Sequence, residues 1–147
     1  MTTSQILDAR EPVTVSETVP RDESHLFFQT GLVGFPEAQR FTLVESGGEG
    51  VFELQSVDEG APDFVVVAPS AFFPDYAPVI DDATAERLDL RSADEALVLL
   101  VVTLRERPED ASANLLAPLV VNGRTRDAAQ VVLNDQPYPL RAPLLSA

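Results

Sequence analysis

The longest apolar run of the chain, ALVLLVVT at residues 96–103, limits most strongly what the protein can fold into. A membrane-spanning helix needs about 20 apolar residues, so this run is far too short to cross a bilayer. Its β-branched residues and its length are typical of a strand that is buried on both faces. The segment DFVVVA at residues 63–68 has the same character. We therefore expect both segments to be central strands of a sheet.

Two pairs of further stretches predict β-hairpins. Residues 40–45 and 51–57 flank the glycine-rich sequence SGGEG, which indicates a hairpin with a loop at residues 46–50. Residues 115–121 and 130–133 flank the sequence NGRTR. Because Asn-Gly is the strongest short-range hairpin signal, we expect a second hairpin there.

Helical signals are few. The segment DATAERL at residues 82–88 has an acidic start that suits a helix N-cap, and SADE at residues 92–95 predicts a capping box for one further turn. Twelve prolines and seven glycines punctuate the rest of the chain. The predicted fold class is all-β: a small closed or partly open β-barrel of short strands with one short helix, or alternatively a sandwich. Residues 1–12 are expected to form a flexible N-terminal arm.

Charge and composition exclude several classes of partner. The net charge is −14, and residues 1–110 hold 22 acids against seven arginines. Such a surface repels nucleic acids and anionic membranes, so we expect neither as a direct partner, and a basic protein is favoured. The absence of cysteine excludes disulfides and thiolate metal sites. Because the N-terminal residues also lack a signal-peptide pattern, we expect a cytoplasmic protein.

The loop PSAFFPDYAPVIDD, residues 69–82, combines three aromatic residues with three prolines. Prolines lower the entropy that a loop loses on binding, and aromatic side chains supply the contact area that protein interfaces favour. The alternative is that the aromatic residues point inward and plug one end of the barrel. We expect Phe72 to point inward, whereas the pattern leaves Phe73 and Tyr76 open.

Residues suited to catalysis or metal binding are sparse. His25 is the only histidine, and no nucleophile elbow, P-loop or dinucleotide-binding motif is present. Asp75, Asp81 and Asp82 are close in sequence but lack the spacing of a calcium loop, and helix capping explains the last two. We therefore expect no catalytic residue, no metal and no cofactor, and we do not expect an enzyme.

Seven short motifs follow one another in an order that is similar to one protein family. They are FQTGLVGF at residues 28–35, LQS with FVVV at 54–67, FPDY at 73–76, VVT before an acidic loop at 101–103, NLLAPLVVN at 114–122, QVVL at 130–133 and YPLR at 138–141. From about residue 12 to residue 145 the chain resembles the flagellar assembly factor FliW family. The resemblance implies a single FliW-like β-barrel domain over residues 13–147.

The resemblance also implies a function. FliW-like proteins are partner switches that bind CsrA, an RNA-binding repressor, and so relieve the repression of flagellin translation. Flagellin binds them in turn and releases CsrA. The resemblance favours a mode in which the acidic protein docks beside the RNA site of CsrA and repels phosphates. Within the matching motifs, the candidate partner-binding residues are Phe73, Asp75, Tyr76, Asn114 and Asn122.

Two other functions stay open at this point. One is a flagellin-specific chaperone without a role in translation. The other is a metal-dependent hydrolase built on His25, Asp75, Asp81 and Asp82. The chain also departs from the family at residues 123–129, where a basic stretch keeps only two arginines, and at Ala142, which replaces a histidine. If those positions contact a partner, the choice of partner differs.

Overall fold

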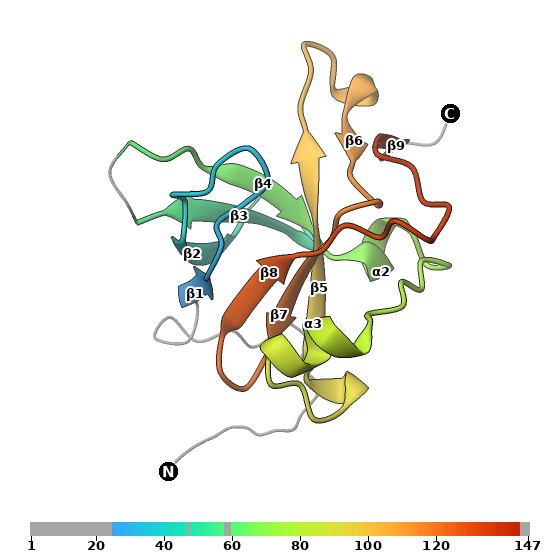
Figure 1. Ribbon diagram of the computed structural model, residues 1–147. Helices are drawn as coiled ribbons and strands as arrows, with labels where there is room; N and C mark the ends of the chain where they lie inside the picture. Colours follow the sequence, from blue (N-terminus) through green and yellow to red (C-terminus); the bar gives the residue numbers. More distant parts are fainter. Residues whose placement is uncertain (1–24, 47, 58–59, 145–147) are drawn as a thin grey trace.

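The computed structural model describes residues 25–46, 48–57 and 60–144 (Figure 1). The predicted arm at residues 1–12 lies outside the described residues, as does the beginning of the predicted domain at residue 13. No helix in the described part of the chain is long and apolar enough to cross a membrane.

Seven strands of the described chain close into a barrel. The strand order is β4-β3-β2-β1-β8-β7-β5, and a further pairing of β4 with β5 completes the circle. Neighbours are antiparallel except β1 and β8, which are parallel. The strands are β1 (His25–Phe28), β2 (Arg40–Glu45), β3 (Val51–Ser56), β4 (Phe64–Val67), β5 (Ala96–Thr103), β7 (Leu119–Asn122) and β8 (Asp127–Gln130). The predicted all-β barrel is confirmed.

Strand β5 is the longest of these strands and connects both sides of the barrel. Its first half, Ala96–Leu99, pairs with β7, and Leu100–Val102 pairs with β4 (Figure 1). The end of β5 also pairs with β6 (Ser112–Ala113), which in turn pairs with β9 (Ala142–Pro143). Both segments predicted as central strands thus have neighbours on both edges.

The barrel interior is filled by the side chains that alternate inward along the strands. The rings of Phe28 and Phe41 meet edge to face with centroids 5.6 Å apart, and Phe41 meets Phe64 in the same way at 6.0 Å. Other members of this cluster are Leu54, Val66, Leu97, Leu99, Leu119 and Val121. Inward and outward alternation is clearest in β1, where Leu26 and Phe28 are buried and their neighbours exposed.

Two apolar clusters lie on the outer side of the barrel and explain why β5 and β7 are apolar on both faces. The first outer cluster is centred on Val67, Leu100, Val102 and Leu115 and is covered by helix α2 (Pro69–Phe72) and the loop after it. The second outer cluster consists of Leu88, Val120 and Ala129 and lies beside helix α3 (Asp82–Arg87). These strands are therefore buried on both faces although the sheet forms a closed barrel.

The second hairpin differs from its prediction in extent. The strands are 119–122 and 127–130, so β8 begins three residues earlier than expected and Asn122 belongs to the strand. Beyond them the chains still pair irregularly, since Val131 N–H donates to the Pro118 carbonyl and Leu133 N–H to that of Leu116. Gly123 is not among the residues with positive φ, and Arg126 takes that conformation instead. The Asn-Gly pair therefore does not form the two-residue turn that its sequence favours.

Helical structure is also richer than predicted. The expected helix is α3, and the Asp81 side chain is its N-cap, accepting a hydrogen bond from Thr84 N–H at 2.8 Å. The single turn α2 was not predicted; Pro69 stands at its start, where a missing N–H costs nothing. The further turn predicted at residues 92–95 forms with Ser92 at its N-cap position, but the predicted capping box does not, because the Ser92 side chain makes no capping hydrogen bond. Two short 3₁₀ turns are η2 (Ala93–Glu95) and η3 (Pro108–Asp110).

Adjacent phenylalanines on β1 test the barrel core. Phe28 is fully buried, whereas Phe27 is 40% exposed on the outer face. We expect Phe28→Ala to lower the free energy of unfolding by about 3–5 kcal/mol, because it leaves a cavity in the packed interior. Phe27→Ala is the matched control and should cost much less. Urea denaturation measures both, and equal losses would contradict this assignment of inner and outer faces.

Candidate functional site

The loop that follows β4 packs on the first outer cluster. Phe72, Phe73 and Tyr76 are all half-buried and all contact this cluster. Pro74 and Asp75 between them are exposed. The aromatic residues thus fasten the loop to the barrel, while Asp75 stands at the surface among them.

Tyr76 is the main anchor of the loop. Its hydroxyl donates a hydrogen bond of 2.6 Å to the Leu115 carbonyl, and its ring meets that of Tyr138 edge to face with centroids 4.7 Å apart. Burial, with a smaller contribution from Tyr138, raises the pKa of Tyr76 well above its ordinary value. The Tyr138 hydroxyl accepts from Ala77 N–H at 3.2 Å. Tyr76 therefore stays neutral. It joins the loop to Leu115 through its hydroxyl and to Tyr138 through its ring.

Two further contacts hold the loop at its ends. The side-chain amide of Gln136 accepts from Val79 N–H at 2.9 Å and donates to the Val79 carbonyl at 3.0 Å. At the other end, Ala68 N–H donates to the Gly50 carbonyl, and a Cβ at Gly50 would lie 2.6 Å from that of Ala71. A glycine is therefore required where the β2–β3 loop meets α2. The loop is exposed yet attached along its length.

Asn114 lies near this loop. The Tyr76 hydroxyl binds the carbonyl of the next residue, Leu115. The side chain of Asn114 is half-buried, and its Oδ1 accepts from Ala117 N–H at 2.9 Å. The fold thus brings four of the five candidate residues to one region: Phe73, Asp75, Tyr76 and Asn114.

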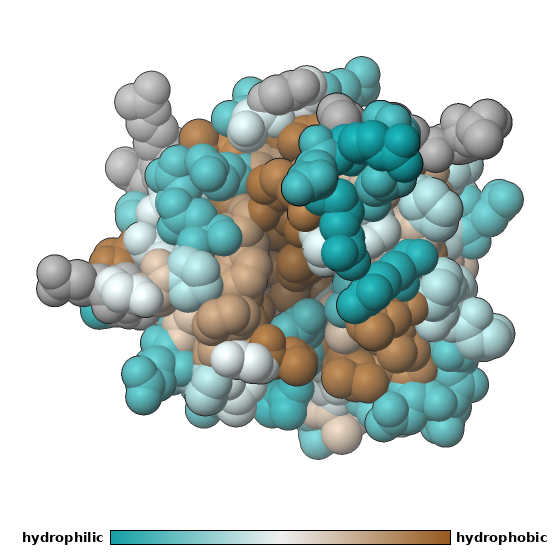
Figure 2. All heavy atoms as spheres, turned by 90° about the horizontal axis from the view of Figure 1, so that it is seen from above, coloured by the Kyte–Doolittle hydropathy of each residue, from teal (hydrophilic) through white to brown (hydrophobic). Residues whose placement is uncertain are grey.

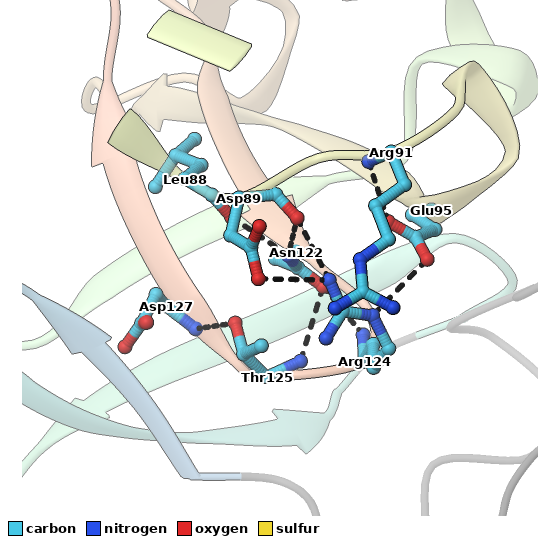
Figure 3. Close-up of polar contacts among 8 residues, drawn as sticks. All are labelled: Leu88, Asp89, Arg91, Glu95, Asn122, Arg124, Thr125 and Asp127. Atoms are coloured by element: carbon cyan, nitrogen blue, oxygen red, sulfur yellow. Dashed lines mark hydrogen bonds and ion pairs between the residues drawn. The ribbon is translucent and has the colours of Figure 1, made fainter. Parts of the chain in front are cut away.

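Asn122 is elsewhere and is fully buried (Figure 3). Its Nδ2 donates to the carbonyls of Leu88 at 2.7 Å and Asp89 at 3.1 Å. Its Oδ1 accepts from the backbone N–H groups of Arg124 at 2.7 Å and Thr125 at 3.0 Å. Every hydrogen-bonding position of this amide is occupied. Asn122 therefore joins the β7–β8 turn to the end of α3 and offers no atom to a partner directly.

Arg124 completes this connection (Figure 3). Its guanidinium lies 3.1 Å from a carboxylate oxygen of Glu95 and 2.8 Å from the Asp89 carbonyl, with the Asp89 carboxylate at 3.2 Å. The other Glu95 oxygen accepts from Arg91 N–H at 2.8 Å. The hydrogen bond from Arg91, followed by that from Arg124, lowers the pKa of Glu95 from its ordinary value of 4.5. One of the two arginines retained in the 123–129 segment is thus used inside the fold.

An apolar surface at one end of the barrel was missed by sequence reasoning. Seen from above, the molecular surface has a hollow of apolar side chains between polar flanks (Figure 2). Because β4 begins where β5 ends, Phe64 and Leu104 both lie at this end, and Val57 follows β3 there. The ring of Phe35 packs against Phe64 at 5.5 Å. We call these four residues the apolar mouth.

The exposure of the apolar mouth is uneven. Leu104 is 63% exposed, Val57 52% and Phe35 43%. In the sequence Val57 and Leu104 look like the ends of buried strands, so their exposure could not be anticipated. One signal for this surface is present in the sequence: Phe35, at the end of FQTGLVGF, is an aromatic residue outside any predicted strand.

The metal hypothesis can be checked against the part of the chain that the structure describes. Within the described residues, no group of three or more His, Cys, Asp or Glu side chains is placed to hold a metal ion. Asp81 is engaged as the cap of α3, and His25 lies on β1. The residues of the hydrolase hypothesis therefore form no common site.

Comparisons with known proteins agree on one family. The family model described as FliW protein matches residues 12–144. The flagellar assembly factor FliW of Bacillus licheniformis is 36% identical over 129 residues, covering 87% of this chain and 90% of the relative. Those of Bacillus subtilis and Symbiobacterium thermophilum are 36% and 38% identical over 84% and 80% of this chain, and 87% and 86% of their own lengths. A crystal structure of the flagellar assembly factor FliW superposes with a TM-score of 0.79 at 30% identity, covering 86% of this chain and 89% of that one.

The Tyr76 anchor can be tested by removing one oxygen atom. We expect Tyr76→Phe to lower the free energy of unfolding by about 1–3 kcal/mol, because the Leu115 carbonyl loses a donor in a half-buried place. Tyr138→Phe is the matched control and should cost less than about 1 kcal/mol, since the exposed Ala77 N–H can bind water instead. Chemical denaturation measures both variants. A larger loss in Tyr138→Phe would refute the assignment of Tyr76 as the anchor.

The lowered pKa of Glu95 predicts a pH dependence. A carboxyl group whose folded pKa lies below its unfolded value stabilises the fold above that value, here 4.5, and this stabilisation is lost as pH falls through the folded pKa. The stability difference between the wild type and Glu95→Gln should thus be constant near neutral pH and shrink in acid. The effect should be smaller but still present in an Arg124→Gln background, because the hydrogen bond from Arg91 N–H, the largest single cause, remains. Urea titrations at several pH values measure it, and a difference that grows in acid would contradict it.

Proposed function

Because this chain belongs to the FliW family of flagellar assembly factors, we propose that it is a partner switch that binds CsrA and flagellin in turn. By binding CsrA it relieves the repression of flagellin translation, and newly made flagellin displaces CsrA again. The protein then acts by binding alone, as a non-enzymatic factor in the cytoplasm, where flagellin is translated.

The observation that carries this proposal is the attached, exposed loop after β4. A partner that binds a loop held by Tyr76, Gln136 and the Gly50 contact need not order it, so the entropic cost of binding is small. The partner-facing residues in this proposal are Phe73, Asp75 and Tyr76, with Asn114 beside them. Asn122 acts indirectly, because it holds the β7–β8 turn in place.

The charge of the chain supports the effect on CsrA. With 22 acids against seven arginines in residues 1–110, the protein carries a strong negative field next to any surface on which it docks. An RNA phosphate that approaches the bound CsrA is repelled over roughly the Debye length, about 8 Å at physiological salt. CsrA need not be blocked sterically for its affinity for RNA to fall.

The apolar mouth favours a second candidate function. A flagellin chaperone without a translational role would need an apolar surface for a segment that is buried in the finished filament. The exposed apolar side chains of Phe35, Val57 and Leu104, at this end of the barrel, are the candidates for it. The affinity of CsrA for RNA separates the two functions, because a chaperone of this kind leaves it unchanged.

Asp75 offers the cleanest test of the loop, because it is exposed and its replacement should leave the fold intact. We expect Asp75→Ala to weaken binding of CsrA or flagellin by about fivefold or more, which corresponds to about 1 kcal/mol for an interface residue. Asp94→Ala, an equally exposed aspartate in η2, is the charge-matched control and should bind normally. Calorimetric titration with each purified partner measures the affinities.

The same titrations can contradict the proposal. If the two variants bind both partners as the wild type does, the loop is not the interface. If the wild type binds flagellin but not CsrA, and leaves the RNA affinity of CsrA unchanged, the chaperone function replaces the switch. If it binds neither partner, both functions fail.

A further inference from the structure

The pair Asn122-Gly123 can undergo deamidation, a reaction that is separate from its structural role. An asparagine side chain can be attacked by the backbone nitrogen of the next residue, and glycine permits this most readily because it has no Cβ. The Gly123 nitrogen loses its proton and bonds to the Asn122 Cγ, while the bond from Cγ to the side-chain nitrogen breaks and ammonia leaves. Water then opens the cyclic imide at either carbonyl. The products are aspartate or isoaspartate, without any oxidation or reduction.

In the fold, every atom of this reaction is engaged elsewhere. The attacking nitrogen of Gly123 donates its proton to the Glu95 carbonyl at 2.7 Å. The leaving nitrogen of Asn122 is held by the carbonyls of Leu88 and Asp89, and the side-chain oxygen by two backbone N–H groups. Asn122 is also fully buried, which keeps the water of the second step away. The reaction therefore requires the β7–β8 turn to separate from α3.

We propose that Asn122-Gly123 is a deamidation site that the fold keeps closed and that reacts only when the contact between the β7–β8 turn and the end of α3 opens. The deamidated fraction of the protein then increases with the time that this contact has spent open, because Asn122 can react only in the open state. Protection of this site depends on the turn geometry alone and not on which partners the protein binds.

Conversion also prevents the contact from forming again. A carboxylate at this position would direct oxygen, and not an amide donor, at the carbonyls of Leu88 and Asp89. Three acceptors would then meet in a place from which water is excluded, and this costs free energy. An isoaspartate would in addition lengthen the backbone and move Arg124 away from Asp89 and Glu95. The reaction is therefore irreversible: it converts the opened protein into one in which the end of α3 no longer binds the β7–β8 turn.

The experiment follows deamidation residue by residue. The full chain is incubated in mildly alkaline buffer with and without denaturing urea, and peptide mass spectrometry measures conversion over time. We expect Asn122 to react in urea faster than Asn114, whose follower is leucine. In native buffer Asn122 should react slower by about a hundredfold or more, which corresponds to an opening free energy of about 3 kcal/mol or more.

Two variants locate the protection. Arg124→Gln removes the contacts with Asp89 and Glu95 but leaves the Asn-Gly pair intact. It should accelerate the reaction in native buffer and leave the rate in urea unchanged. Gly123→Ala should slow the reaction in urea, because the new methyl group hinders the attack.

Three outcomes would overturn the proposal. The first is an equal rate at Asn122 in native buffer and in urea, which would show that the fold gives no protection. The second is a rate in urea no higher than that of Asn114. The third is an Asn122→Asp variant as stable as the wild type in chemical denaturation, which would contradict the loss of this contact; a variant that is destabilised or fails to fold supports that loss.

Discussion

Closure of the barrel through the pairing of β4 with β5 is the constraint on which the rest of the structure depends. Strand β5 is long enough to pair with β7 along its first half and with β4 along its second. Closure removes the open edges that these apolar strands would otherwise expose. It also places the beginning of β4 beside the end of β5, so Phe64 and Leu104 lie at the same end of the barrel.

A closed barrel of this size buries only one face of each strand, yet β5 and β7 are apolar on both. Their outer side chains are covered by the segments that leave and rejoin the barrel, namely α2 with its loop on one side and α3 on the other. The loop after β4 is therefore part of the core and part of the surface at once. Its half-buried aromatic side chains supply stability. Their exposed parts, together with Asp75 between them, are available to a partner, and this links the proposed function to packing.

The contact between the β7–β8 turn and the end of α3 is held by hydrogen bonds and ion pairs, and not by apolar packing. Asn122 binds two carbonyls at the end of α3 and two N–H groups of the β7–β8 turn. A buried amide of this kind is stabilising only while all its partners stay in place. In our proposal the same hydrogen bonds also protect the Asn-Gly pair from deamidation. One set of contacts therefore stabilises the fold and prevents a chemical change in the chain.

The fold class, the first hairpin, the central strands and α3 could be predicted from local patterns, because strand periodicity and capping residues act over short distances. The motifs of the sequence also identified the family. Three features became visible only in the folded protein: Tyr76 donates to the Leu115 carbonyl, Asn122 is buried, and Phe35 packs against Phe64. The extent of the second hairpin and the partner of Glu95 were also decided there, since Arg124 and Glu95 are 29 residues apart. Contacts over such separations depend on how the closed barrel orders its strands, and no local pattern encodes that order.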